Sequence, residues 1–271
     1  MMNPFHKTRG LSLFIALCAA LSHFHASAAI LPESRTTQIR NAAPGDTYQE
    51  VIGIRNTGLT AVDVKIYQTD YSFSADGLND YGKPGSLPRS NAKWLHLGQG
   101  QVTVPPGGVA NVRYEVSVPR DTDLSGTYWS LLMIEPVSGQ EAAGARKGEV
   151  SVTQAVRYAV QVVSEIGSSG KVELAFRKPG VLARDGKHLF SIDLENTGEQ
   201  WLRPQLTLEL FDSEGRLSRK LVQQQQRIYP ATSVRYRFDL HDVHPGRYRA
   251  LIVADSTGDD LFGTQVELIV P

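Results

Sequence analysis

The sequence contains very little cysteine. Its one cysteine, Cys18, lies inside an N-terminal apolar run, and Leu17 before it is too large for a lipoprotein cleavage site. If the N-terminal segment is removed, the remaining chain can form neither a disulfide nor a thiol nucleophile. The fold must therefore be stabilised by the burial of apolar side chains alone.

The N-terminal segment has the features of a cleaved signal peptide. Lys7 and Arg9 give it a cationic start, the run Leu11–Leu21 is apolar but too short to span a bilayer, and Ala26–Ala28 offers a small-x-small cleavage site. We therefore expect residues 1–28 to be removed on export. An uncleaved membrane anchor is the alternative.

An excess of charge of either sign is also missing. The 28 basic residues equal the 28 acidic ones, and loss of Lys7 and Arg9 with the signal peptide leaves 26 basic against 28 acidic residues. So nearly neutral a surface argues against nucleic acid as the main partner. No later run is apolar enough to span a membrane, so we expect an exported, soluble chain without stable membrane insertion.

Convincing helical periodicity is absent, and strand signals dominate. The 24 glycines and 14 prolines divide short runs rich in Val, Ile, Tyr and Thr, which is typical of an all-β sandwich. Val62, Val64 and Ile66, for example, alternate with polar residues, as expected of a half-buried strand.

Several of these signals occur twice in the same order. The triplet Asn56–Gly58 returns as Asn196–Gly198, and a Gly-x-Tyr turn also appears in both halves. This repeat predicts two tandem immunoglobulin-like β-sandwiches, residues 29–166 and 167–271, joined by a Gly/Ser linker. The tyrosines of the repeated turn are candidate tyrosine corners: Tyr128 and Tyr248.

Signals of an active site or a metal site are missing as well. No Gly-x-Ser-x-Gly, His-Glu-x-x-His or phosphate-binding loop occurs. His241 and His244 are only two potential zinc ligands, and they lie in a predicted loop. The Asp-rich segments Asp76–Asp80 and Asp255–Asp260 lack the ligand pattern of an EF-hand. We predict a non-enzymatic protein with neither a cofactor nor a bound metal.

Aromatic residues gather in one stretch of the first half. Tyr67, Tyr71, Phe73 and Tyr81 are close in sequence, and Tyr71 and Phe73 share one face of a strand. Two interpretations are open. The stripe could stack on sugars or cell-wall glycans, or it could pack in an ordinary core.

One long alternating stretch, residues 149–166, lies where the first half ends. Its apolar residues fall on one face of an extended strand: Val150, Val152, Val156, Tyr158, Val160 and Val162. Only that face is strongly apolar. This pattern fits an internal strand of a sandwich, and it also fits a strand that offers its apolar face to a partner.

The region around this strand resembles a known family. Ser125–Pro136, the polar loop Ser138–Lys147 and the long strand resemble, in this order, the PapD-like periplasmic pilus-assembly chaperones. The resemblance is strongest over residues 30–166, and it implies two immunoglobulin-like domains in the periplasm. It further implies that Val150–Val163 is donated to an exported, pilin-like subunit that lacks its own last strand.

The resemblance also implies how the subunit is held. A basic residue on the long strand and another on the first strand would bind the terminal carboxylate of the subunit. The implied partner-binding residues are Arg35, Val152, Val156, Arg157, Tyr158, Val160 and Val162. An outer-membrane usher is a further implied partner, and an exposed strand could pair with a second copy. The chain departs from the family where the strand ends, with Val163–Ile166 in place of a Tyr-Arg-Pro-like sequence.

A second resemblance predicts a different role. Trp94–Leu97, Val102–Val112 and the Gly-x-Tyr turn at Tyr128 look like segments of the WxL-interacting proteins of Gram-positive cell walls. Those proteins bind peptidoglycan and a surface partner through similar sandwiches, and they normally end in a membrane helix that this chain lacks. The alternative function is therefore that of a cell-surface or peptidoglycan-associated structural or adhesion protein.

Overall fold

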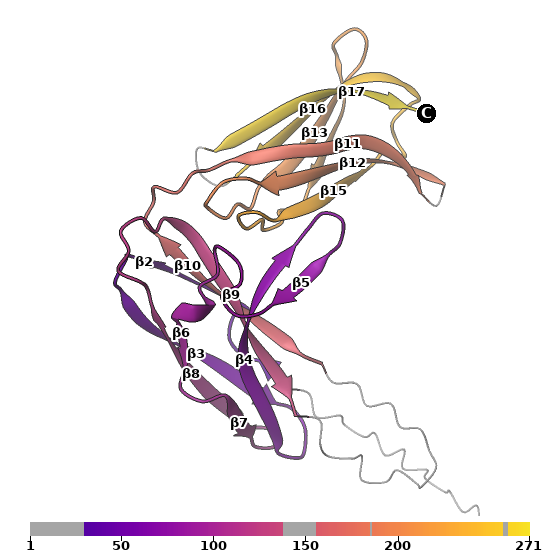
Figure 1. Cartoon of the computed structure of the whole chain (residues 1–271). Helices are drawn as coiled ribbons and strands as arrows, with labels where there is room; N and C mark the ends of the chain where they lie inside the picture. The colour runs from indigo at the N-terminus through magenta and orange to yellow at the C-terminus, as the bar shows by residue number, and fades with distance from the viewer. Residues whose placement is uncertain (1–29, 138–155, 185, 257–259) are drawn as a thin grey trace, which may run out of the picture.

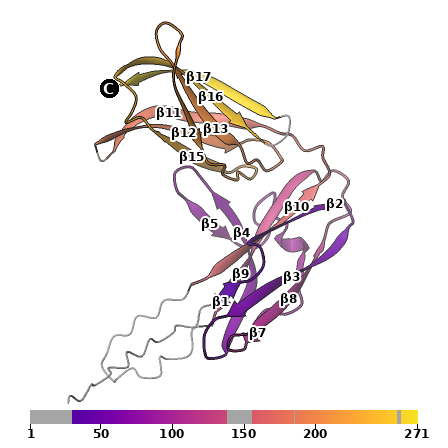
Figure 2. The ribbon, with the colours of Figure 1, turned by 180° about the vertical axis from the view of Figure 1, so that it is seen from behind.

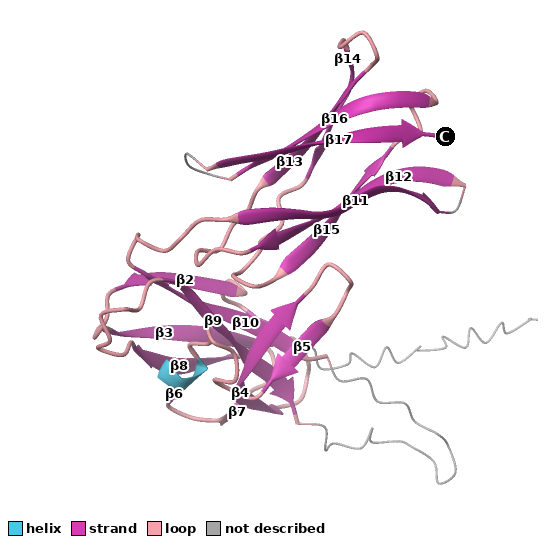
Figure 3. Cartoon of the chain, turned by 45° about the horizontal axis from the view of Figure 1, so that its top comes forward, coloured by secondary structure: helices cyan, strands magenta, loops and turns pink. Residues whose placement is uncertain are grey.

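The computed structural model describes residues 30–137, 156–184, 186–256 and 260–271 (Figure 1). The first half contains the strands β1 (Ile30–Pro32), β2 (Thr37–Ala42), β3 (Thr47–Asn56), β4 (Val62–Phe73), β5 (Asn79–Gly82), β6 (Leu95–Leu97), β7 (Gln101–Val104), β8 (Val109–Ser117), β9 (Gly126–Pro136) and β10 (Tyr158–Ile166). The second half contains β11 (Leu174–Arg184), β12 (Lys187–Asn196), β13 (Gln205–Phe211), β14 (Leu217–Gln223), β15 (Ser233–Asp239), β16 (Gly246–Asp255) and β17 (Leu261–Val270). In the part of the chain that is described, helix is confined to one 3₁₀ turn, η1 (Ala92–Trp94), shown in Figure 3.

The first sandwich is formed by two sheets. Their strand orders are β1–β3–β8–β6 and β2–β10–β9–β4–β5, with β7 paired to β4. Alternation along the strands sends every second side chain inward. Ile52 and Ile54 of β3 therefore meet Val64 and Ile66 of β4 in a closed apolar core. Burial of this core is the main stabilising contribution in a domain without disulfides.

The second sandwich is also formed by two sheets, each with fewer strands than its counterpart in the first sandwich. Its strand orders are β11–β12–β15 and β14–β13–β16–β17. Phe190 and Ile192 of β12 pack opposite Leu206 and Leu208 of β13, and all four side chains are fully buried. The prediction of an all-β fold with two tandem immunoglobulin-like β-sandwiches is confirmed. The exact domain boundary at residue 166 remains a prediction.

The repeated Asn-Thr-Gly triplets adopt the same structure in both sandwiches. The Asn56 amide donates to the carbonyl of Thr60 at 2.7 Å, and its side-chain oxygen accepts the Gly58 N–H at 2.9 Å. Asn196 makes the equivalent contacts with Gln200 at 2.7 Å and Gly198 at 2.9 Å. Both asparagines are completely buried, so each side chain satisfies backbone groups that the turn would otherwise leave unpaired.

The two candidate tyrosine corners differ. The hydroxyl of Tyr248 donates to the carbonyl of His244, four residues upstream, at 2.9 Å, which is the contact that defines such a corner. The ring of Tyr128 instead packs against Trp94, with ring centroids 4.7 Å apart. Tyr248 is therefore a tyrosine corner, whereas the ring of Tyr128 packs against the core of the first sandwich.

The two sandwiches meet at one end and enclose an angle (Figures 1 and 2). The β4–β5 hairpin leaves the first sandwich and reaches β15 of the second, as both views show. A third apolar cluster fills the junction: Trp129, Val163 and Tyr229, with Phe73 and Trp201 packed against them. Trp129 and Tyr229 stack with centroids 4.8 Å apart, so aromatic contact joins the two domains.

Candidate partner-binding site

The edge of β10 is only partly covered by neighbouring strands. On one side β10 pairs antiparallel with β9 along its whole length, from Tyr158 opposite Ile134 to Ile166 opposite Gly126. On the other side β2 pairs in parallel, but only from Gln161 onward. Among the described residues, Tyr158–Val160 therefore has no strand partner on the β2 side. Unpaired backbone groups at such an edge are a template for an added strand.

The course of the N-terminal strand explains why β2 ends where it does. β1 pairs with β3 in one sheet, whereas β2 pairs with β10 in the other. The chain thus crosses between the sheets just before Thr37, and Arg35 lies in that crossing. The Gln161 N–H donates to the Thr36 carbonyl at 2.8 Å. Because backbone direction alternates along a strand, the Ala159 N–H points to the same side, at the uncovered part of the edge.

The predicted partner-binding residues on β10 divide into two groups. Val160 and Val162 are 0% and 1% exposed and belong to the first core, and Tyr158 packs partly buried against it. The side chains of Val160 and Val162 are consequently committed to the chain's own sandwich, whereas Tyr158 keeps part of its side chain exposed. Val156 precedes β10 and is 52% exposed. Val152 lies outside the described residues.

The opposite face of β10 packs against the second domain. Val163 is 1% exposed within the junction cluster, and the Trp201 indole donates a hydrogen bond to Glu165. The Gln161 side-chain oxygen accepts hydrogen bonds from the Tyr229 hydroxyl at 2.9 Å and from Thr37 at 3.1 Å. Both faces of the C-terminal half of β10 are therefore covered. Among the described residues of this segment, the stretch around Val156 and the edge up to Val160 are left open.

Burial fixes the protonation state of one member of this network. It raises the pKa of the Tyr229 phenol to about 12, and Arg227 nearby opposes this rise. The phenol therefore stays protonated near neutral pH. It is a hydrogen-bond donor to Gln161 across the domain boundary.

The two predicted carboxylate anchors are placed apart. Arg157 is exposed on the sheet surface, where its pKa is raised by a hydrogen bond with Tyr67 and by the nearby Glu135, 4.0 Å away. Arg35 lines a different place, a hollow of about 450 Å³ that it shares with Thr36, Thr37, Ile39 and Arg227. Arg227 of the second domain thus lines the same hollow as Arg35. Arg157 does not line it.

Arg227 has unused hydrogen-bonding capacity. Its guanidinium lies over the Trp201 ring, 4.7 Å from the centroid, and Nη1 is 3.5 Å from the Gln161 side-chain oxygen. Its Nε is buried without a hydrogen-bond partner. Within the described residues Arg227 forms no ion pair, so its positive charge is available to an anion in the hollow. Arg227 lies 66 residues from Gln161, and no local sequence pattern predicts their contact.

The other sequence candidates have structural contacts of their own. His241 lies beside Asp239 and Asp242, and the described residues include no group of three or more side chains able to hold a metal ion. Asp76 forms ion pairs with Arg235 at 3.0 Å and Lys178 at 3.5 Å. The Asp255–Asp260 segment lies partly outside the described residues.

The aromatic stripe has a mixed environment. Tyr71 lies between Phe73 and Tyr81, with ring centroids 5.6 and 5.2 Å away. Phe73 packs against Tyr229 at the junction, whereas Tyr81 is 57% exposed. The stripe thus leads from the surface of the hairpin into the domain junction.

No helix in the described residues is long and apolar enough to cross a membrane.

No family model and no curated protein matches this chain. In structure, it is similar to pilus chaperones, as the sequence resemblance predicts. The class 5 fimbriae chaperone CfaA is 13% identical, with a TM-score of 0.48 over 90% of this chain and 100% of that one. The chaperone–tip subunit complex CsuC–CsuE of Acinetobacter baumannii is 13% identical, with a TM-score of 0.45 over 90% and 98%. The Pseudomonas aeruginosa chaperone CupB2 is 12% identical, with a TM-score of 0.40 over 89% and 100%.

Proposed function

We propose that this chain is a periplasmic chaperone that binds a pilus or surface-fibre subunit by β-strand addition. The observation that carries the proposal is the uncovered edge of β10 at Tyr158–Val160, which ends at the Arg35–Arg227 hollow. An added strand would pair with this edge through its backbone, which supplies affinity with little dependence on sequence. No catalytic chemistry is needed for such a role.

The position of the hollow indicates in which direction the added strand would run along β10. β2 occupies the far end of the same edge and runs parallel to β10. A subunit strand in line with β2, and also parallel to β10, would end at Arg35 and Arg227. Its terminal carboxylate would then meet two guanidinium groups, the pairing that arginine geometry favours. Arg227 takes the place that the sequence resemblance gave to Arg157.

Specificity in this proposal comes from the stretch before β10. Val156 is exposed, and by the period-two pattern Val152 belongs to the same face if the strand extends toward residue 150. We assign these two valines to the groove of the subunit. Val160 and Val162 instead hold β10 in the first sandwich, residues 29–166, and the second sandwich, residues 167–271, contributes Arg227. An outer-membrane usher is the proposed acceptor of the loaded complex.

The test is co-expression with an exported pilin-like subunit from the same genome. The yield of soluble complex from the periplasm is measured for the wild-type chain, for Val156→Asp and for the double variant Arg35→Gln/Arg227→Gln. Each change is expected to lower the yield at least about tenfold, because a buried charge or a lost charge-assisted contact costs more than about 1.4 kcal/mol. Arg216→Gln, at an exposed arginine paired with Asp212, is the control.

Two outcomes would contradict the proposal. An unchanged yield with both variants would exclude strand addition at this edge. Sedimentation of the purified chain with peptidoglycan would favour the wall-associated alternative. Size-exclusion chromatography of the free chain tests whether a second copy covers the β10 edge, since capture of the subunit should then shift a dimer to a one-to-one complex.

A further inference from the structure

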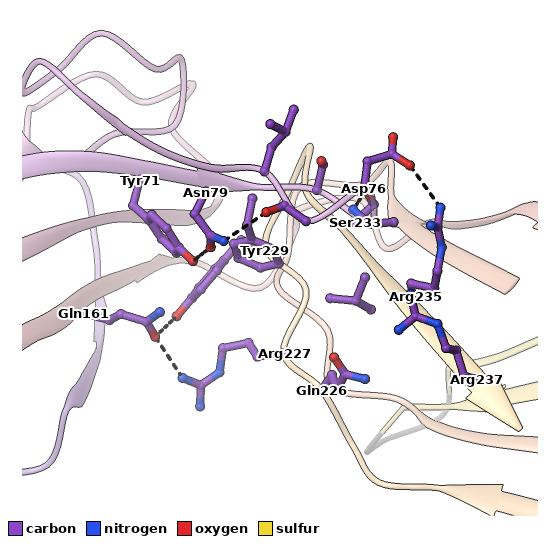
Figure 4. A pocket seen from close by; sticks show the side chains of 16 residues that line it. Tyr71, Asp76, Asn79, Gln161, Gln226, Arg227, Tyr229, Ser233, Arg235 and Arg237 are labelled. Atoms are coloured by element: carbon purple, nitrogen blue, oxygen red, sulfur yellow. Dashed lines mark hydrogen bonds and ion pairs between the residues drawn. The ribbon is translucent and has the colours of Figure 1, made fainter. Parts of the chain in front are cut away.

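A second hollow lies beside the first, between the hairpin and the second domain. It measures about 590 Å³. Figure 4 shows Tyr71 and Asn79 on the hairpin side, Tyr229 and Gln161 next to them, and Arg227, Gln226 and Arg237 on the side of the second domain. We call this space the inter-domain cleft. Its walls combine aromatic rings with amide and guanidinium groups, a lining that suits a polar or charged side chain.

The charges around the cleft do not cancel. Arg235 is neutralised by two carboxylates, Asp193 with Oδ2 2.7 Å from Nη2 and Asp76 at 3.0 Å. Arg227 and Arg237 form no ion pair with any described residue. Two arginines of the cleft are therefore left with free positive charge. An anionic group between the walls would accept charge-assisted hydrogen bonds from these two arginines. These bonds would replace the hydrogen bonds that the group makes with water.

The cleft and the Arg35–Arg227 hollow are neighbours, because Arg227 lines both of them. Neighbouring residues of an extended chain are about 3.3 Å apart along the strand. A strand whose terminal carboxylate occupies the Arg35–Arg227 hollow would thus place the side chain of a residue just before its terminus at the mouth of the cleft.

We propose that the inter-domain cleft recognises an acidic side chain next to the C-terminus of the bound subunit, with Arg237 as the residue that selects for it. This inference rests on the proposed function, since the subunit strand brings the acidic residue to the cleft. Arg235 and Arg237 share the outward face of β15. The ion pairs of Arg235 with Asp193 and Asp76 therefore help to fix the position of the strand that carries Arg237. Arg237 contributes the free charge.

Short acetylated peptides of alternating Val and Thr provide the probe. One ends in Asp-Val and the other in Asn-Val, both with a free C-terminus. Binding to the full chain is followed by tryptophan fluorescence, because Trp201 lies under Arg227 and Trp129 stacks on Tyr229. The wild-type chain should bind the Asp peptide about tenfold more tightly, as one charge-assisted hydrogen bond predicts.

Variants separate the two arginine sites. Arg237→Gln should bring the Asp peptide to the affinity of the Asn peptide and leave the Asn peptide unchanged. Arg35→Gln should weaken both peptides alike, and Arg216→Gln should weaken neither. Inorganic phosphate is the third probe. Binding of phosphate as tight as that of the Asp peptide would overturn the proposal, because the cleft would then be a site for any small anion.

The failure of this inference can be told from the failure of the proposed function. Equal binding of the two peptides by the wild-type chain, including binding of neither, overturns selection by Arg237. If the Arg35→Gln/Arg227→Gln chain still loses its subunit in co-expression, strand addition stands and only the cleft assignment falls. If that variant and Val156→Asp both keep their subunit, both fall.

Discussion

Replacement of Asp70 by asparagine should destabilise the first sandwich strongly. Asp70 lies on β4 with no exposed surface. Its carboxylate accepts the backbone N–H groups of Gly85 at 3.0 Å, Ser86 at 2.6 Å and Leu87 at 2.7 Å. The hydroxyls of Ser86 and Ser90 donate to it as well. One buried charge thus holds the whole loop between β5 and η1.

The same loop connects the two domains. It carries Arg89, which pairs with Glu199 of the second domain at 2.7 Å and donates to the Ser125 carbonyl at 2.8 Å. The asparagine amide would turn an N–H₂ group toward some of the loop's donors. At least two donors would lose their partner, and each unsatisfied buried group costs about 1–3 kcal/mol. We expect Asp70→Asn to cost about 2–5 kcal/mol, a large fraction of the roughly 5–15 kcal/mol that stabilises a typical domain.

Guanidinium unfolding followed by tryptophan fluorescence measures this loss. Ser90→Ala removes one hydrogen bond to the carboxylate and should cost about 1.5–3 kcal/mol. Asp80→Asn, at an exposed aspartate of β5, should stay within about 0.5 kcal/mol of the wild type. A loss below about 1 kcal/mol for Asp70→Asn would refute the reasoning, because the carboxylate would then not hold the loop.

The pH dependence of stability provides an independent check on Asp70. Burial alone would raise the pKa of its carboxyl group, but the hydrogen bonds from Ser90, Leu87, Gly85 and Ser86 outweigh burial and lower the pKa. A carboxyl group whose pKa is lower in the folded chain stabilises the fold above its unfolded pKa of about 3.9, and this stability is lost as the pH falls through the folded value. The stability difference between the wild type and Asp70→Asn should therefore be constant near neutral pH and shrink in acid below about pH 4.

Three further changes test the junction and the repeat. Gly126→Ala should loosen the domain junction and speed its proteolysis, because the backbone has a φ of +74° and an added Cβ would collide with the Glu199 carbonyl. Tyr229→Phe should cost about 0.5–1.5 kcal/mol in chemical unfolding, since the hydroxyl no longer donates to Gln161. Asn196→Ala should cost about 2–4 kcal/mol in the unfolding of the second sandwich, because the Gly198 N–H and the Gln200 carbonyl lose their hydrogen-bond partner.

Local pattern was sufficient to predict the architecture. Alternation placed Val62–Ile66 on a strand whose inner face is buried, and the repeated Asn-Thr-Gly triplets marked equivalent turns. Both signals operate over a few neighbouring residues, where the geometry of a strand or turn alone decides which side chains are buried. The tyrosine corner at Tyr248 belongs to the same class, because its partner is four residues away.

The candidate site could be predicted only in part because it depends on contacts between distant segments. Alternation identified the apolar face of the long strand, but a face that is buried in its own core looks the same in sequence as one offered to a partner. Val160 and Val162 proved to be of the first kind. Arg227 meets Arg35 only because the second sandwich packs on the outer face of β10. The isolated apolar side chain of Val163 on that outer face was the one sequence signal of this packing.

The amide of Ala159 provides the most direct test of strand addition. Its N–H points toward the part of the β10 edge that no described strand covers, whereas the next amide along the chain, that of Val160, faces β9. Hydrogen exchange should be fast at Ala159 and slow at Val160 in the free chain. Binding of a pilin-like subunit should slow exchange at Ala159 by about tenfold or more, because its N–H gains a backbone partner. Unchanged exchange at Ala159 in a stable complex would contradict strand addition at this edge.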